Sequence, residues 1–127
     1  MKNIAVEGMT LIFSDPLVNG TIAIVGAASS KVKATTGVYK DGLEISVSAI
    51  TYPSAGATIP DPGPYSSNIN SSAVKVKAET ILVLLEGDES DTINATPKIP
   101  NSPSPIDFPI SFKVKIQAAG QIKAKAN

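Results

Sequence analysis

Four carboxylates lie within six residues at positions 86–91 (EGDESD), and carboxylates at such close spacing can bind Ca²⁺. The segment lacks the alternating Asp-x-Asp-x-Asp spacing and the distant bidentate Glu of a helix-loop-helix calcium site. We therefore interpret it as a solvated turn. We expect the protein to hold no metal and no cofactor.

The side chains that carry out most nucleophilic catalysis are missing, because the chain has no Cys and no His. This composition excludes Ser-His triads, thiolate nucleophiles and zinc sites built from Cys and His. A Ser-Lys dyad would need a lysine of lowered pKa, but the lysines of the repeated segments alternate with apolar residues and should face solvent. No pair among the eleven acidic residues is marked out as the carboxylates of a glycosidase. We predict that the protein is not an enzyme.

Eleven lysines balance eleven acidic residues, and the chain contains no Arg. A formal net charge of zero argues against a nucleic-acid groove, which needs a basic excess. Glu7 interrupts the N-terminal segment before the apolar part of a signal peptide could form. We expect one domain, residues 1–127, made in the cytoplasm without a signal peptide.

Alternating apolar and polar residues indicate β-strands along the chain, most clearly at residues 43–49. Continuous apolar runs at residues 21–25 and 81–85 predict strands that are covered on both faces. The segments 52–70 and 96–109 are rich in Pro, which lacks the N–H donor of a central strand. We predict that both are surface loops, and loops of this length often contact a partner.

A short repeat organises this all-β chain. Residues 31–34 (KVKA) recur at 75–78 (KVKA) and at 113–116 (KVKI), with a fainter echo at 123–126 (KAKA). The first two copies are each followed by an apolar segment that ends in an acidic residue and Gly, which signals a turn. We therefore predict several similar β-hairpins related by approximate symmetry.

The same alternation predicts which side chains are buried. The lysines expected on the solvent-facing side are Lys31, Lys33, Lys75 and Lys77. The residues expected in the core are Leu43, Val32, Val38, Ile45, Val47, Val76, Val83 and Leu85.

The repeat resembles that of PAAR-like proteins, which form the spike tip of contractile injection systems (phage tails, type VI secretion and extracellular injection particles). The resemblance covers about residues 20–95 and is carried by residues 30–32 leading to 38–42, and by 74–78 leading to 83–88. The Pro-Ala-Ala-Arg tetrapeptide is absent, and the family's His and Cys metal ligands have no counterpart. If the fold is shared, its apex must be closed without the usual zinc.

The resemblance implies a compact single domain of short hairpins in a pseudo-three-fold, cone-like arrangement. It also implies a structural role without catalysis, in which one copy caps the trimeric central spike and contacts the target membrane transiently. The protein would be a monomer when isolated, and would leave the cell as part of a phage-tail-like particle.

Two alternatives remain open: a trimeric decoration or fibre protein of a phage or particle, and a β-sandwich module that binds carbohydrate or protein. For the cap, we predict a partner-binding surface with few charges, since the centres of interfaces exclude charge. The residues expected there are Ile106, Phe108 and Ile110, which alternate along one face, together with Ile59 and Tyr65 of the first Pro-rich segment.

Overall fold

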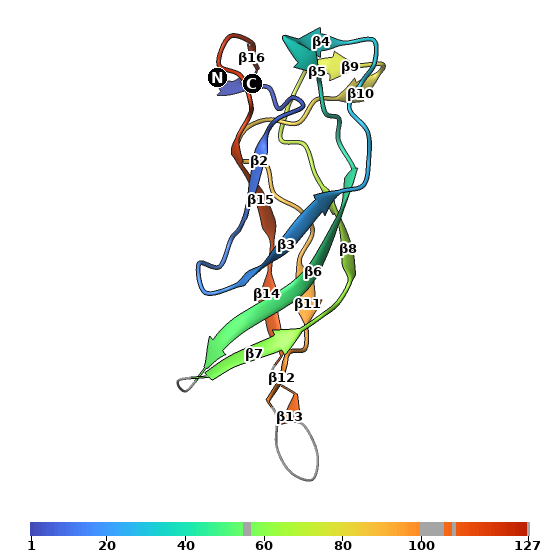
Figure 1. Ribbon diagram of the computed structural model, residues 1–127. Coiled ribbons are helices and arrows are strands. Elements are labelled where there is room, and N and C mark those ends of the chain that lie inside the picture. Colours follow the sequence, from blue (N-terminus) through green and yellow to red (C-terminus); the bar gives the residue numbers. More distant parts are fainter. Residues whose placement is uncertain (55–56, 100–105, 108, 127) are drawn as a thin grey trace.

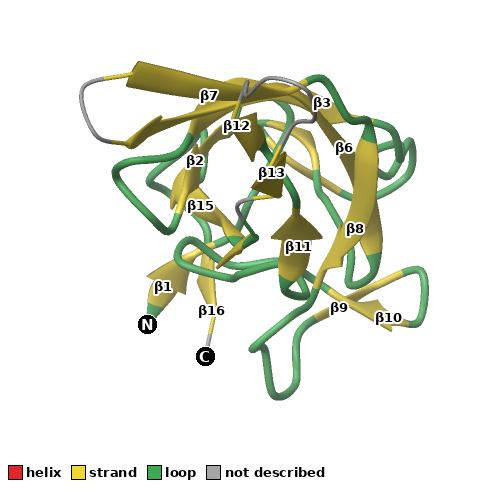
Figure 2. Ribbon diagram, turned by 90° about the horizontal axis from the view of Figure 1, so that it is seen from below, coloured by secondary structure: helices red, strands yellow, loops and turns green. Residues whose placement is uncertain are grey.

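The computed structural model describes residues 1–54, 57–99, 106–107 and 109–126. Its elements are short antiparallel strands, and the described residues contain no helix, which confirms the all-β prediction. It follows that no helix in this part of the chain is suited to crossing a membrane. Figure 1 shows an elongated molecule whose N- and C-terminal ends lie side by side at one end. Seen along the long axis, the strands encircle that axis (Figure 2).

The largest sheet has four strands: β3 (Asn19–Ile24), β6 (Leu43–Ser54), β7 (Ala57–Asp61) and β8 (Tyr65–Ile69). The long strand β6 is central, pairing with β3 on one edge and with β8 and then β7 on the other. Leu43, Ile45 and Val47 are buried, as the alternation predicts. The polar residues between them face away from the core.

The prediction that residues 52–70 form a loop is wrong for most of that segment, which contains the end of β6 and strands β7 and β8. The prolines are tolerated because they lie at the margin of the sheet. Pro60 belongs to β7, which ends the sheet, and Pro53 lies beyond the last residue of β6 that pairs with β3. In residues 96–109 the loop prediction is wrong for Lys98–Ile99 (β12) and Ile106–Asp107 (β13), which pair with each other, while residues 100–105 and 108 lie outside the described residues.

The apolar run 21–25 is not covered on both faces as predicted. Ile22 is half-buried, whereas Ile24 and Val25 are exposed. Strand β3 pairs only with β6 among the described strands, so one edge and much of one face remain open to solvent.

Two further strand pairs complete the body. Strand β2 (Thr10–Phe13) pairs with β15 (Val114–Ala118), and β11 (Ile93–Ala95) pairs with β14 (Ile110–Phe112). Between these pairs and the main sheet lies the main core, in which the rings of Phe13 and Phe112 meet edge to face with centroids 5.4 Å apart. Its largest fully buried side chains are Ile45, Ile50, Ile69, Leu84, Ile116, Val47 and Val114.

Three two-stranded antiparallel sheets lie at the end of the molecule that holds the termini (Figure 1). We call all three hairpins, although the two strands of the third come from opposite ends of the chain. Their strands are β4 (Lys33–Ala34) with β5 (Thr36–Gly37), β9 (Lys77–Ala78) with β10 (Ile81–Leu82), and β16 (Lys125–Ala126) with β1 (Lys2–Asn3). The third hairpin therefore joins the two ends of the chain. The expectation that residues 113–116 form a third repeat is wrong: they enter β15, and the fainter copy at 123–126 provides the third hairpin.

Candidate functional site

Behind the three hairpins, three chain segments meet in what we call the ring: residues 4–6, 38–40 and 83–85. The backbone N–H of Ala5 donates to the carbonyl of Leu84 (2.9 Å), that of Leu84 to Tyr39 (3.0 Å), and that of Tyr39 back to Ala5 (3.0 Å). The three bonds thus close on themselves. Each segment leads into a turn of an acidic residue and a Gly with positive φ: Gly8 at 98°, Gly42 at 80° and Gly87 at 93°.

The ring separates two cores. Its middle residues Ala5, Tyr39 and Leu84 belong to the main core. The residues that flank them belong to a second core beneath the hairpins, together with Ala78 and Ala126 of the hairpins themselves; these ring residues are Ile4, Val6, Val38, Val83 and Leu85. Lys40, at the sixth flanking position, is only half-buried. The prediction that residues 81–85 are covered on both faces is confirmed for 83–85. It is wrong for Ile81, which is 41% exposed, and for Leu82, which is half-buried.

Each hairpin is joined to the ring by the same two kinds of backbone hydrogen bond. At the first residue of each ring segment the N–H donates to the segment before the hairpin: Val38 to Val32 (3.1 Å), Val83 to Val76 (3.1 Å) and Ile4 to Ala124 (3.0 Å). At the acidic turn residue the N–H donates to the strand that leaves the hairpin: Glu7 to Gly37 (2.9 Å), Asp41 to Leu82 (2.8 Å) and Glu86 to Asn3 (2.8 Å). These bonds define corresponding positions in the three hairpins.

We define the hairpin end as residues 1–3, 29–37, 71–82 and 121–126. It holds seven of the eleven lysines and one carboxylate, Glu79, a formal net charge of +6. The rest of the chain holds four lysines and ten carboxylates, a net charge of −6. All seven lysines are exposed, which confirms the prediction for Lys31, Lys33, Lys75 and Lys77. The lysines of this chain of zero net charge are therefore concentrated in the three hairpins, and the acidic turn residues Glu7, Asp41 and Glu86 lie directly behind them.

Exposed apolar side chains accompany these lysines. Met1, Val74 and Ile122 are 78%, 70% and 78% exposed. A crevice of about 330 Å³ between the second and third hairpins is lined by Met1, Val74, Val76 and Ala126. Another of about 300 Å³, between the third and first hairpins, is lined by Ile122 and Thr36. The repeat predicted that these lysines are exposed, but neither their gathering at one end nor the exposure of Met1 and Ile122 had a signal in the sequence.

Val76 is wrongly predicted to be buried, because it is 38% exposed in the first of these crevices. Val32, its counterpart in the first hairpin, packs partly against the second core. A strand pair of two residues each is too small to cover both of its faces, so alternation alone does not decide burial there.

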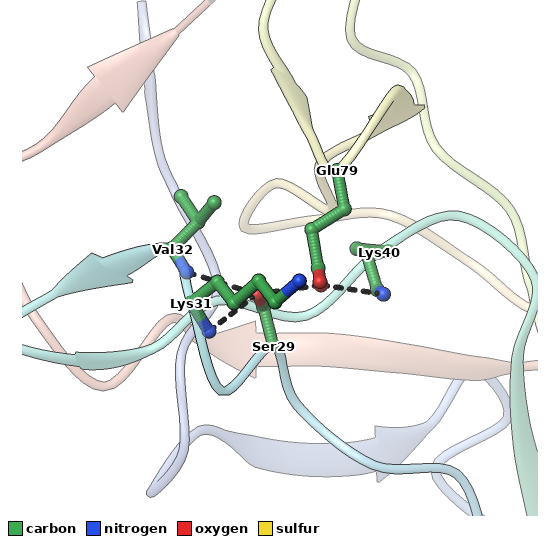
Figure 3. A network of polar contacts seen from close by, with 5 residues as sticks. All are labelled: Ser29, Lys31, Val32, Lys40 and Glu79. Carbon is green, nitrogen blue, oxygen red and sulfur yellow. Dashed lines mark hydrogen bonds and ion pairs between the residues drawn. The ribbon is translucent and has the colours of Figure 1, made fainter.

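Polar contacts fill the remaining junction, between the first and second hairpins (Figure 3). The Ser29 hydroxyl donates to Glu79 Oε2 (2.7 Å) and accepts the N–H of Val32 (2.9 Å). Lys40 Nζ lies 3.0 Å from the same carboxylate oxygen of Glu79. The hydrogen bond from Ser29, followed by the contacts with Lys40, lowers the pKa of Glu79 below the ordinary value for a glutamate.

The acidic segment 86–91 is only partly a solvated turn. Glu89 and Asp91 are exposed, but Asp88 is 4% exposed. Asp88 Oδ2 accepts the N–H of Leu85 (2.7 Å), and Oδ1 accepts the Ser72 hydroxyl. Both oxygens of Asp88 are thus used to fix the turn. Within the described ranges, no group of three or more acidic, His or Cys residues is placed to hold a metal ion.

The predicted partner-binding residues that the structure describes, Ile59, Tyr65, Ile106 and Ile110, lie in the half of the molecule opposite the hairpins (Figure 1). Ile59 lies in β7 opposite Tyr52, and Ile106 lies in β13 opposite Ile99. Phe108 lies outside the described residues. This surface stays a prediction.

The other two predicted contact residues are half-buried and pack against the main core. They are Ile110 and Tyr65, and the Tyr65 hydroxyl donates to Asp61 Oδ2. Both side chains therefore already have packing partners within the chain, and only part of each is accessible to another molecule.

Comparisons of the chain with protein-family models, with curated protein sequences and with solved structures found no match in any of the three. The proposals below rest on the geometry of the ring and the hairpin end, and on the repeat in the sequence.

Proposed function

We propose that the protein is a non-enzymatic cap for the end of a trimeric protein shaft, and that the shaft is the central spike of a contractile injection system. The observation that carries this proposal is the closed ring of hydrogen bonds among Ala5, Tyr39 and Leu84. The hairpin-to-ring hydrogen bonds recur at three places around it. These features support a pseudo-three-fold arrangement of the single chain.

Such an arrangement allows one chain to make similar contacts with three identical subunits. A trimeric shaft presents the same surface three times at its end, and a symmetric contact requires matching surfaces on the other side. Three similar hairpins in one chain supply that match with one copy of the cap. The cap also covers open strand edges, which otherwise pair with other chains.

The role is mechanical: the cap travels at the front of the spike and contacts the target membrane transiently during injection. A cone-like taper away from the shaft would concentrate the force on a small area. The repeats at 31–34 and 75–78, each followed by an acidic residue and Gly, favour this system over other shafts, through their resemblance to PAAR-like proteins.

The test is the stoichiometry of the complex. The protein is mixed with its cognate trimeric spike protein, and the mass is measured by light scattering after gel filtration. We expect 13.1 kDa for the protein alone and three spike chains plus one cap for the complex. A protein that forms a trimer alone would support the decoration or fibre alternative. Binding to glycans in an array without binding to the spike would support the β-sandwich module.

Either end of the molecule could face the shaft. The surface with Ile59, Tyr65, Ile106, Phe108 and Ile110 is one candidate, and the hairpin end is the other. The variants described in the next subsection separate them.

A further inference from the structure

We propose that the hairpin end is the face that binds the shaft, and that the shaft presents carboxylates to its lysines. This inference rests on the proposed function and adds the orientation of the cap and the chemistry of the partner.

The first argument is the position of the charges. Lys33, Lys77 and Lys125 occupy the same place in β4, β9 and β16, one residue before an Ala that pairs across the hairpin or across the termini. The lysines two residues earlier in each copy are Lys31, Lys75 and Lys123. Two positive charges therefore recur in every hairpin. Glu79 is the one carboxylate within the hairpin segments themselves, and Glu7 of the neighbouring turn lines the crevice beside Ile122. In a trimer with one acidic cluster in each subunit, each cluster would contact one of these three lysine pairs.

The second argument is the apolar surface between the charges. Met1, Val74 and Ile122 are more than two-thirds exposed, and they lie at the two open junctions between hairpins. Apolar side chains flanked by charged ones are typical of the centre and rim of a protein interface. Burial of these three side chains would supply affinity, whereas the lysines would supply orientation and rate of association.

The remainder of the chain carries the opposite net charge. It holds six more carboxylates than lysines. Some of these carboxylates lie directly behind the hairpins, where Glu7, Asp41 and Asp88 accept hydrogen bonds from Gly37, Ser71 and Ser72. An acidic shaft attracts the exposed lysines in front of them.

An anionic bilayer or a nucleic acid would also attract the lysines. Neither requires the same pair of charges at three corresponding positions, and the absence of Arg removes the side chain best suited to phosphate. The recurrence of the pairs therefore favours a protein trimer.

The experiment compares two double variants that change the net charge equally. Lys33→Glu with Lys77→Glu reverses two charges at the hairpin end, and Lys113→Glu with Lys115→Glu reverses two exposed charges near β15 in the body. Affinity for the purified spike trimer is measured at low and at physiological salt. We expect the hairpin variant to lose at least about tenfold in affinity at low salt, with a smaller loss at higher salt because exposed charges are screened. The body variant should change affinity by less than about twofold.

The outcomes separate the two proposals. If the unmodified protein does not bind the spike, the proposed function is wrong. If it binds with one copy per trimer and both double variants bind equally well, the function stands and the hairpin end is not the interface. Vesicles containing phosphatidylserine and duplex DNA serve as additional probes. Lysine-dependent binding to either, with unchanged binding to the spike, would overturn the inference. Equal urea midpoints for the variants show that all are folded.

Discussion

Replacement of Leu84 by Ala tests whether the ring is a packed structural centre. The Leu84 side chain is fully buried in the main core, and its backbone makes two of the three ring hydrogen bonds. The substitution removes the equivalent of about three methylene groups, and at roughly 0.8 kcal/mol each their transfer contributes about 2.4 kcal/mol. The cavity adds to this cost, because three backbone segments joined by hydrogen bonds cannot collapse into it freely. We expect a loss of about 3–5 kcal/mol in the free energy of unfolding.

The assay is equilibrium unfolding in urea, followed by tyrosine fluorescence, with Val74→Ala as the control. Val74 is 70% exposed, so its truncation should change the free energy of unfolding by less than about 0.5 kcal/mol. The slope of the transition should be the same for both variants, which shows that the surface exposed on unfolding is unchanged. Equal urea midpoints for Leu84→Ala and Val74→Ala would refute the packing of the ring described above.

Three further predictions concern single contacts. Asp88→Ala should cost about 1–3 kcal/mol of stability in urea unfolding, because it leaves the buried N–H of Leu85 without its acceptor; a cost below 0.5 kcal/mol would contradict the role of this carboxylate. Gly37→Ala should lower the melting temperature by several degrees, since the new Cβ would lie 2.6 Å from the carbonyl oxygen of Ser29, and an unchanged melting temperature would show that the backbone can yield there. The lowered pKa of Glu79 means that its carboxylate stabilises the folded state above the pKa of the unfolded chain, and that this contribution disappears as the pH falls through the folded-state pKa. A titration of Glu79 by NMR should therefore show a midpoint below that of an ordinary glutamate, and Ser29→Ala should raise it; identical midpoints would count against the hydrogen bond in Figure 3.

The strands and turns that depend on neighbouring residues could be predicted from the sequence. The alternation at residues 43–47 determined which face of β6 is buried, because successive side chains of a strand point to opposite sides. Acidic residues followed by Gly marked two turns, since Gly adopts the positive φ that these turns need. The exposure of the repeated lysines followed from the same alternation and the cost of burying a charge.

Only the tertiary structure decided which strands pair with one another. The copies at 113–116 and 123–126 have similar patterns, but the first pairs with β2 in the body and the second joins β1 across the two ends of the chain. A local pattern specifies the pleat of a strand and not its partner, which depends on residues more than a hundred positions away.

The burial of Asp88, the exposure of Val76 and the gathering of the lysines all depend on which segments the fold brings together. Asp88 is buried because Ser72 and Leu85 bring donors to it, and Val76 is exposed because nothing fills the crevice beside it. Net charge is a sum over the chain and contains no positions, so a total of zero could not reveal seven lysines gathered at one end. The sequence determined the pleat and the turns, and the folded arrangement determined which surfaces face a partner.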